Sequence, residues 1–166
     1  VLDADEKRIT AYHEAGHALV SSVLEHADPV HKISIISRGR AAGYTLKLPF
    51  EDRKLQSKNE FLDDIAVSLG GYLVEKMIFG DVTTGPSNDL QVSTALARDM
   101  VTKYGMSDKI GPVALEGSGR MLIGKNSMAE DREYSERVGA LIDSEVSLII
   151  ENNMVRVKEI LEKYKG

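Results

Sequence analysis

The sequence contains no cysteine. Disulfide bonds and thiolate metal sites are therefore excluded, and any bound zinc must be held by His, Asp or Glu side chains. The absence of cysteine also fits a reducing compartment. Histidine is scarce as well, because the chain has only four, all within its first third. A metal ligand from the rest of the chain must therefore be a residue other than histidine.

Long apolar runs and excess basic charge are also absent. No segment approaches the roughly 20 apolar residues of a membrane-spanning helix, and no signal-peptide pattern opens the chain. The net charge of −5 at pH 7, without a dense Lys/Arg cluster, argues against a nucleic-acid-binding surface. No phosphate-binding loop ending in Gly-Lys-Ser/Thr is found. We therefore expect a soluble polypeptide with no nucleic-acid partner.

The remaining composition is that of a globular domain. The chain has 166 residues, of which 42% are apolar and 28% charged, which is enough for one domain with its own hydrophobic core. It begins with Val rather than Met, and charged helical sequence follows almost at once. We therefore expect residues 1–166 to form one domain cut from a longer protein.

Hydrophobic periodicity predicts a mainly α fold with a small β-hairpin near the N-terminal helix. Apolar residues recur at helical spacing over about 5–25, 58–79, 88–104 and 135–163. Ser87 is the expected N-cap of the third helix. Alternating apolar residues predict two strands, 32–36 and 44–48, joined by a basic loop, and the glycine-rich stretch 105–126 is expected to be irregular. Gly70-Gly71 weakens the second helix, so we expect another element to pack closely there.

One stretch carries a chemical signal: residues 11–20 read AYHEAGHALV. On a helix, His13 and His17 lie one turn apart on the same face and can hold one ion together. A zinc ion lowers the pKa of a bound water, and Glu14 beside it can accept the proton. A chance match is the competing interpretation. The well-patterned helix, with Gly16 leaving space beside the pair, favours a metal site.

A third ligand cannot be assigned from spacing. His26 and His31 follow the end of the first helix and would need a tight fold-back. Glu75 lies in the otherwise apolar stretch GGYLVEKMIFG, and Asp89 lies at the start of a helix, where a carboxylate is favoured by the helix dipole. Glu75 and Asp89 therefore both remain candidates.

Several segments together resemble the FtsH family of membrane-bound, ATP-dependent zinc metalloproteases. They are HEAGHALV, HKISIISRGRAAGYT, GGYLVEKMIFGDVTTGPSNDL, ARDMVTKYGMSDKIGPVAL and YSERVGALIDSEV, in the family's order along nearly the whole chain. The resemblance covers only the family's protease domain. It implies Zn²⁺ held by His13, His17 and Asp89, with Glu14 as general base. Glu75 would contact a ligating histidine rather than the metal and fix its ring and tautomer.

The resemblance also has implications for the longer protein. A membrane anchor and an AAA-type ATPase domain would precede this region, at the cytoplasmic face of the membrane. The full-length protein would form a homo-hexamer that feeds unfolded or membrane proteins to the peptidase. The chain departs from the common family pattern at Tyr72 and Lys76, where Gly-Gly-Arg-Ala-Ala-Glu-Glu reads GGYLVEK, at Pro86 before Ser-Asn-Asp, and at Arg137 in YSER. None of these positions is a proposed ligand.

Three functions follow as hypotheses. The first is a zinc endopeptidase, whose polypeptide substrate would lie along the strand 44–48 and contact Tyr44, Thr45 and Leu46. In the competing interpretation that strand is paired only for structure. The second function is a non-catalytic helical oligomerisation module with a structural metal, which would fill the fourth coordination position with a protein ligand. The third is a zinc hydrolase of another substrate class, which would have a small closed pocket.

Overall fold

The computed structural model describes residues 4–24, 30–34, 44–47, 55–115 and 128–164. Their elements, in chain order, are α1 (Ala4–Val23), β1 (Val30–Ser34), β2 (Tyr44–Lys47), α2 (Lys58–Phe79), α3 (Ser87–Thr102) and α4 (Met128–Lys163). The predicted mainly helical fold is confirmed. None of the helices in the described part combines the length and apolar character that a bilayer crossing needs.

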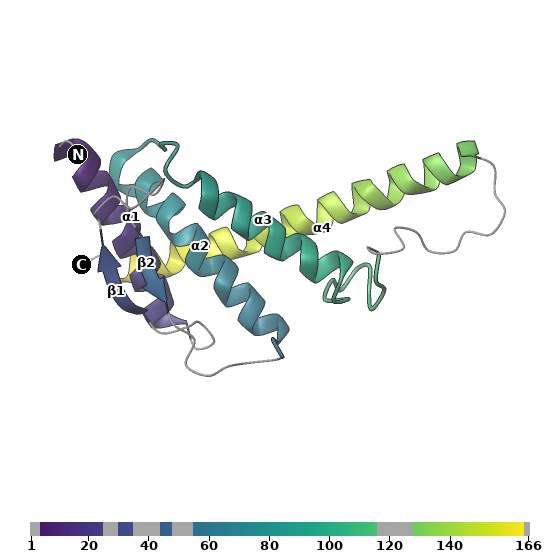
Figure 1. Ribbon diagram of the computed structural model, residues 1–166, viewed down its shortest axis with the longest axis horizontal. Coiled ribbons are helices and arrows are strands. Elements are labelled where there is room, and N and C mark those ends of the chain that lie inside the picture. Colours follow the sequence, from purple (N-terminus) through teal and green to yellow (C-terminus); the bar gives the residue numbers. More distant parts are fainter. Residues whose placement is uncertain (1–3, 25–29, 35–43, 48–54, 116–127, 165–166) are drawn as a thin grey trace.

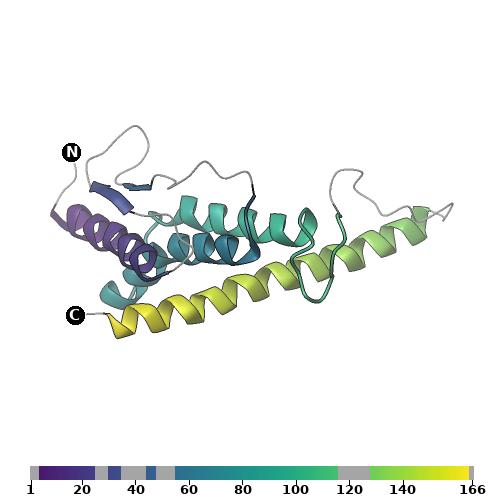
Figure 2. The same ribbon diagram turned by 90° about the horizontal axis from the view of Figure 1, so that it is seen from below.

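The helices form two layers. Figure 2 shows α4 running along one side of α1, α2 and α3, while the two strands lie on the opposite side, next to α1. The N-terminal part of α4 extends beyond the other helices, and the start of α1 and the end of α4 lie at the other end of the molecule (Figure 1). The helix α2 packs against α1, α3 and α4 and is therefore the centre of the domain.

The helix boundaries follow local sequence signals, with two exceptions. The predicted range of α2 is confirmed: the Ser57 hydroxyl accepts a hydrogen bond from the Glu60 N–H at 3.1 Å, and Gly80 ends the helix with a φ of 69°. The predicted Ser87 N-cap of α3 is wrong, because Pro86 occupies that position and makes no side-chain cap. The helix α4 begins at Met128 rather than near 135. The sequence of its first two turns is charged and shows no apolar stripe, so hydrophobic periodicity does not predict them.

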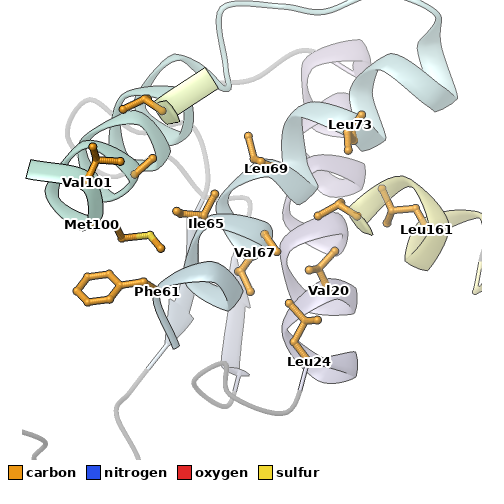
Figure 3. Close-up of a cluster of buried hydrophobic side chains, with 14 of the residues drawn as sticks. Val20, Leu24, Phe61, Ile65, Val67, Leu69, Leu73, Met100, Val101 and Leu161 are labelled. Atoms are coloured by element: carbon orange, nitrogen blue, oxygen red, sulfur yellow. The ribbon is translucent and has the colours of Figure 1, made fainter. Parts of the chain in front are cut away.

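The hydrophobic core lies where α2 meets α1, α3 and α4 (Figure 3). Several apolar residues that recur at helical spacing in the sequence are buried there: Val20, Phe61, Ile65, Leu69, Leu73, Ile142, Val157 and Leu161. Others, such as Leu19, Met77 and Val138, are partly buried and pack against this core. Three others from the same patterns are exposed, Tyr12 by 40%, Val23 by 37% and Ile78 by 37%. Val23 and Ile78 lie at the C-terminal ends of α1 and α2. Tyr12 packs its ring edge against Phe79, at 5.6 Å between ring centroids, outside the core.

The helices α1 and α2 cross in close contact at glycine residues. A Cβ atom at Gly16 would lie 2.6 Å from Val74 Cγ2 and 2.8 Å from the Gly70 carbonyl oxygen, and one at Gly70 would lie 2.9 Å from the Gly16 carbonyl oxygen. These separations are shorter than van der Waals contact, so the backbones can approach this closely only without side chains. The expectation that another element packs against Gly70-Gly71 is confirmed, and that element is α1.

The predicted β-hairpin is present. The strands β1 and β2 pair antiparallel, with Ser34 opposite Tyr44, Ile33 opposite Thr45 and Lys32 opposite Leu46. The register shifts between Lys32 and Val30, and Val30 lies opposite Lys47. Residues 35, 36 and 48 of the predicted strands lie outside the described residues. The described sheet has two strands, so in this part of the structure β2 pairs along one edge only.

Substitution of Gly16 by Ala should destabilise the domain. The new methyl group would have to push α1 away from α2, and overpacking of this kind typically costs about 1–3 kcal/mol in the free energy of unfolding. Urea unfolding in the presence of a chelator measures this effect without any contribution from bound metal. Gly139→Ala on α4 is the matched control, because its Cβ would meet no atom within 4 Å, and it should leave stability unchanged or raise it. Equal stability of the two variants would contradict the packing argument.

Candidate metal centre

The two histidines of the sequence motif lie on the buried face of α1. His13 is 8% exposed and His17 is 7% exposed. Their rings meet edge to face, with 4.7 Å between centroids, and their Nε2 atoms are 3.0 Å apart. The helical spacing of four residues thus directs the same nitrogen of each ring to one point, as the sequence predicts.

The opposite nitrogen of each ring is bound by α2. His17 Nδ1 lies 2.6 Å from the carbonyl oxygen of Val67, and His13 Nδ1 lies 2.8 Å from Glu75 Oε2. A carbonyl and a carboxylate only accept hydrogen bonds, so both Nδ1 atoms carry the proton and donate it. In the neutral imidazole the Nε2 atoms then carry lone pairs. Both rings are therefore held in the tautomer that leaves Nε2 available to a metal.

Three positions one turn apart on α2 form this support. The carbonyl of Val67 binds His17, and the carboxylate of Glu75 binds His13. Gly71 lies between them, and a Cβ there would be 2.5 Å from His13 Nε2 and 2.6 Å from its Cε1. The ring of His13 therefore rests directly on the α2 backbone. A residue with a side chain at position 71 would push the ring out of place.

A carboxylate from α3 completes the cluster. Asp89 Oδ2 lies 2.8 Å from His13 Nε2 and 3.1 Å from His17 Nε2. Asp89 is in the first turn of α3, where the helix dipole favours a negative charge. Three atoms that accept hydrogen bonds thus converge within 3.1 Å of one another. Such a group of lone pairs is repulsive unless a positive charge lies among them.

The pKa shifts of two of these groups agree with that requirement. Burial lowers the pKa of His13, but its hydrogen bonds to Asp89 and Glu75 outweigh burial and raise the pKa above the usual 6.5. Burial raises the pKa of Asp89, but its hydrogen bonds to His13 and His17 outweigh this and lower the pKa to about 2. Asp89 is therefore ionised at neutral pH, and the cluster stabilises positive charge at the imidazole of His13.

The arrangement fits a zinc ion. Zinc bonds of about 2.0–2.1 Å in tetrahedral geometry place neighbouring ligand atoms about 3.3–3.4 Å apart. The observed separations of 2.8, 3.0 and 3.1 Å are only a few tenths of an ångström smaller. Two imidazole nitrogens and one carboxylate oxygen also form a common donor set of catalytic zinc, which uses three protein ligands and leaves the fourth position to water or substrate.

Glu14 is a third carboxylate near the histidines, besides Glu75 and Asp89. It is 5% exposed, and one ligand atom each of His13, Glu14 and His17 can be chosen so that all three lie within 4.8 Å of one another. Both Glu14 and Asp89 thus qualify as a third ligand by proximity. The Asp89 oxygen is in contact with both Nε2 atoms, and this direct contact favours Asp89 as the ligand.

The structure brings together His13, Glu14, His17, Glu75 and Asp89 from three helices. Of the other histidines considered as ligands, His26 lies outside the described residues and His31 lies in β1. The strand candidates Tyr44, Thr45 and Leu46 lie in β2 and pair with β1.

Two supporting groups were not predicted from the sequence, the Val67 carbonyl and the space at Gly71. The signal for the second was present, because Gly71 and Glu75 have the same four-residue spacing on α2 as the two histidines have on α1.

Comparison with known proteins gives a family match over the whole chain: the sequence profile described as "Peptidase family M41" matches residues 1–166. The chain is 52% identical over 165 residues to an "ATP-dependent zinc metalloprotease FtsH" of Pseudothermotoga lettingae, covering 99% of this chain and 26% of that protein. It is 48% identical over 166 residues to a protein of the same name from Thermotoga maritima, covering 99% and 27%. The chain thus spans about a quarter of the length of the curated relatives it matches.

Replacing Asp89 by Ala should reduce zinc affinity more than replacing Glu75 by Ala. The first change removes an oxygen bound to the metal, whereas loss of an outer partner typically costs about 10–100-fold in affinity. Titration of the purified chain with zinc against a chromophoric chelator measures both. Asp5→Ala, which removes an exposed acid from the first turn of α1, controls for net charge and should bind zinc like the parent chain. The reverse ranking would make Glu75 the ligand.

Proposed function

Because this chain belongs to peptidase family M41, we propose that it is the zinc-dependent endopeptidase domain of a larger ATP-dependent protease. The observation that carries the proposal is the convergence of His13 Nε2, His17 Nε2 and Asp89 Oδ2 within 3.1 Å of one another. The proximity of Glu14 supports a hydrolytic reaction, since a carboxylate beside a zinc site can act as general base.

In this proposal the zinc ion is held by His13, His17 and Asp89. When bound, it supplies Lewis-acid chemistry, because it makes water more acidic and polarises the carbonyl of a peptide bond. Glu14 accepts the proton from the attacking water and transfers it to the departing amine. Glu75 holds His13 through Nδ1, and the Val67 carbonyl holds His17 in the same manner. Burial of these partners prevents water from competing for the ring nitrogens.

Two other functions are less well supported. A structural metal in a helical oligomerisation module would require a fourth protein ligand in contact with the ion. Asp89 is in direct contact with both histidines, and in this proposal Glu14 serves as general base rather than as a fourth ligand, in keeping with the peptidase family of the chain. A zinc hydrolase of another substrate class would share this chemistry, but the family membership favours peptide bonds.

The properties of the whole protein extend this proposal. The relatives are named ATP-dependent, and this chain spans about a quarter of their length. We propose that the rest of the protein supplies an AAA-type ATPase and a membrane anchor, and that it assembles as a homo-hexamer. Unfolded and membrane proteins would be delivered to the zinc site at the cytoplasmic face of the membrane. The family resemblance supports these points.

The strand β2 is the proposed platform for the substrate. Peptidases hold their substrates extended, and the unpaired edge of a strand can bind such a chain by main-chain hydrogen bonds. Within the described residues β2 pairs with β1 along one edge, and both strands pack next to α1, which carries the two histidines. Tyr44, Thr45 and Leu46 would then contact the peptide.

Replacing Glu14 by Gln should abolish cleavage while zinc binding is retained. The amide fills the same space but cannot accept a proton, and a general base typically contributes about 100–10,000-fold in rate. The measurements are zinc content and the cleavage rate of an unfolded, fluorescently labelled polypeptide. The exposed Glu151 on α4, replaced by Gln, is the matched control and should cleave like the parent. Loss of zinc from the Glu14 variant, or a parental rate, would remove Glu14 from this role.

Proline substitution in β2 should slow cleavage without loss of zinc. Proline removes one main-chain N–H, so Thr45→Pro or Lys47→Pro should lower the rate several-fold wherever the lost N–H points away from β1. Thr45→Val and Lys47→Ala change the side chains but keep the N–H groups, and serve as controls. If both proline variants fold, bind zinc and cleave at the parental rate, β2 is not the substrate platform.

A further inference from the structure

Both carboxylate oxygens of Glu75 are bound in the structure, but only one of them contacts His13. Glu75 Oε2 accepts the hydrogen bond from His13 Nδ1 at 2.8 Å. Glu75 Oε1 accepts a hydrogen bond from the Thr83 hydroxyl at 2.6 Å and a longer one from the Thr83 N–H at 3.3 Å. Glu75 is 1% exposed, so Thr83 provides polar partners that water cannot easily replace.

The hydroxyl of Thr83 has a defined direction. Its oxygen accepts a hydrogen bond from the Gly85 N–H at 3.0 Å. A hydroxyl group has a single proton, and in Thr83 that proton points to the carboxylate of Glu75. The residue as a whole is exposed on the turn between α2 and α3, yet this group faces a buried acid. The turn therefore provides an oriented donor for Glu75.

We propose that Thr83 is a positioning residue of the metal centre, which acts through Glu75 on His13. The proposal rests on the proposed zinc-binding function of the site. A glutamate side chain has three rotatable bonds, and a contact at one oxygen leaves the carboxylate free to turn. Contacts at both oxygens fix its plane, and with it the direction from which it accepts the His13 proton. Thr83 thereby maintains the ring orientation that presents Nε2 to the metal.

The location of Thr83 in the chain strengthens this assignment. The segment 75–89 starts with the acid that binds His13 Nδ1 and ends with Asp89, which contacts His13 Nε2. Thr83 is near the middle of this segment and joins the turn to its first residue. The same turn therefore determines where Asp89 enters the site and how firmly Glu75 is held.

Zinc affinity of this chain tests the proposal without any measurement of cleavage. Thr83→Val keeps the shape of the side chain but removes the hydroxyl, and should weaken zinc binding about 10-fold, at the lower end of the range for outer partners. Thr83→Ser keeps the hydroxyl and should bind zinc with about the affinity of the parent chain. Thr84→Val changes the adjacent threonine, whose hydroxyl is not in this set of contacts, and should bind zinc like the parent. Thermal unfolding with a chelator checks that all variants fold alike.

A double-mutant cycle identifies the route of the effect. If Thr83 acts through Glu75, Thr83→Val should cause no further loss of zinc affinity in a Glu75→Ala background. The same loss in both backgrounds, or no loss in the parent background, would overturn the proposal. If Thr83→Val does not fold, the cycle is repeated with Thr83→Ala and read in the same way. A parent chain that binds no zinc would instead refute the proposed function of the site.

Discussion

The close contact between α1 and α2 is the constraint on which the metal centre depends. At Gly16 and Gly70 the two backbones are in direct contact, and at Gly71 the ring of His13 rests on α2 without an intervening side chain. This proximity allows a main-chain carbonyl, at Val67, to reach an imidazole of the opposite helix. If the helices were separated by ordinary side chains, His13 and His17 would still share one face of α1, but the main-chain carbonyl of Val67 could not reach the ring of His17.

The electrostatics of the cluster require positive charge among its acceptor atoms. Three acceptor atoms and the carboxylates of Glu14 and Glu75 are gathered in a largely buried space. Such a group is stable only if protons or a cation compensate the negative charge. The surrounding core supplies the free energy that keeps it assembled, and a ligand that binds only the folded state adds to that stability. The raised pKa of His13 and the lowered pKa of Asp89 have the same origin.

The sequence predicted local features well and distant ones poorly. The range of α2 and many of the buried stripe residues depend on neighbours a few positions away, and these predictions are confirmed. For the same reason His13 and His17 lie on one face of α1. The choice between Glu75 and Asp89 could not be made from the residues alone, because each meets the histidines from more than 60 positions away along the chain. The first turns of α4 were missed, since they carry charge without an apolar stripe. Thr83 was missed for a related reason: a threonine in a turn has no periodic signal.

The two ring nitrogens of His13 are bound from the two ends of one short segment. Its α2 end provides Glu75 and its α3 end provides Asp89. In the turn between them, the Thr83 hydroxyl donates a hydrogen bond to Glu75. Any change in the length of this turn would therefore disturb both contacts of His13 at once, whereas the contact of His17 with Val67 lies on the preceding turns of α2. The histidines are thus supported unequally. His17 contacts Asp89 of this segment at Nε2 and is held at Nδ1 by Val67 of α2, whereas both ring nitrogens of His13 depend on the segment.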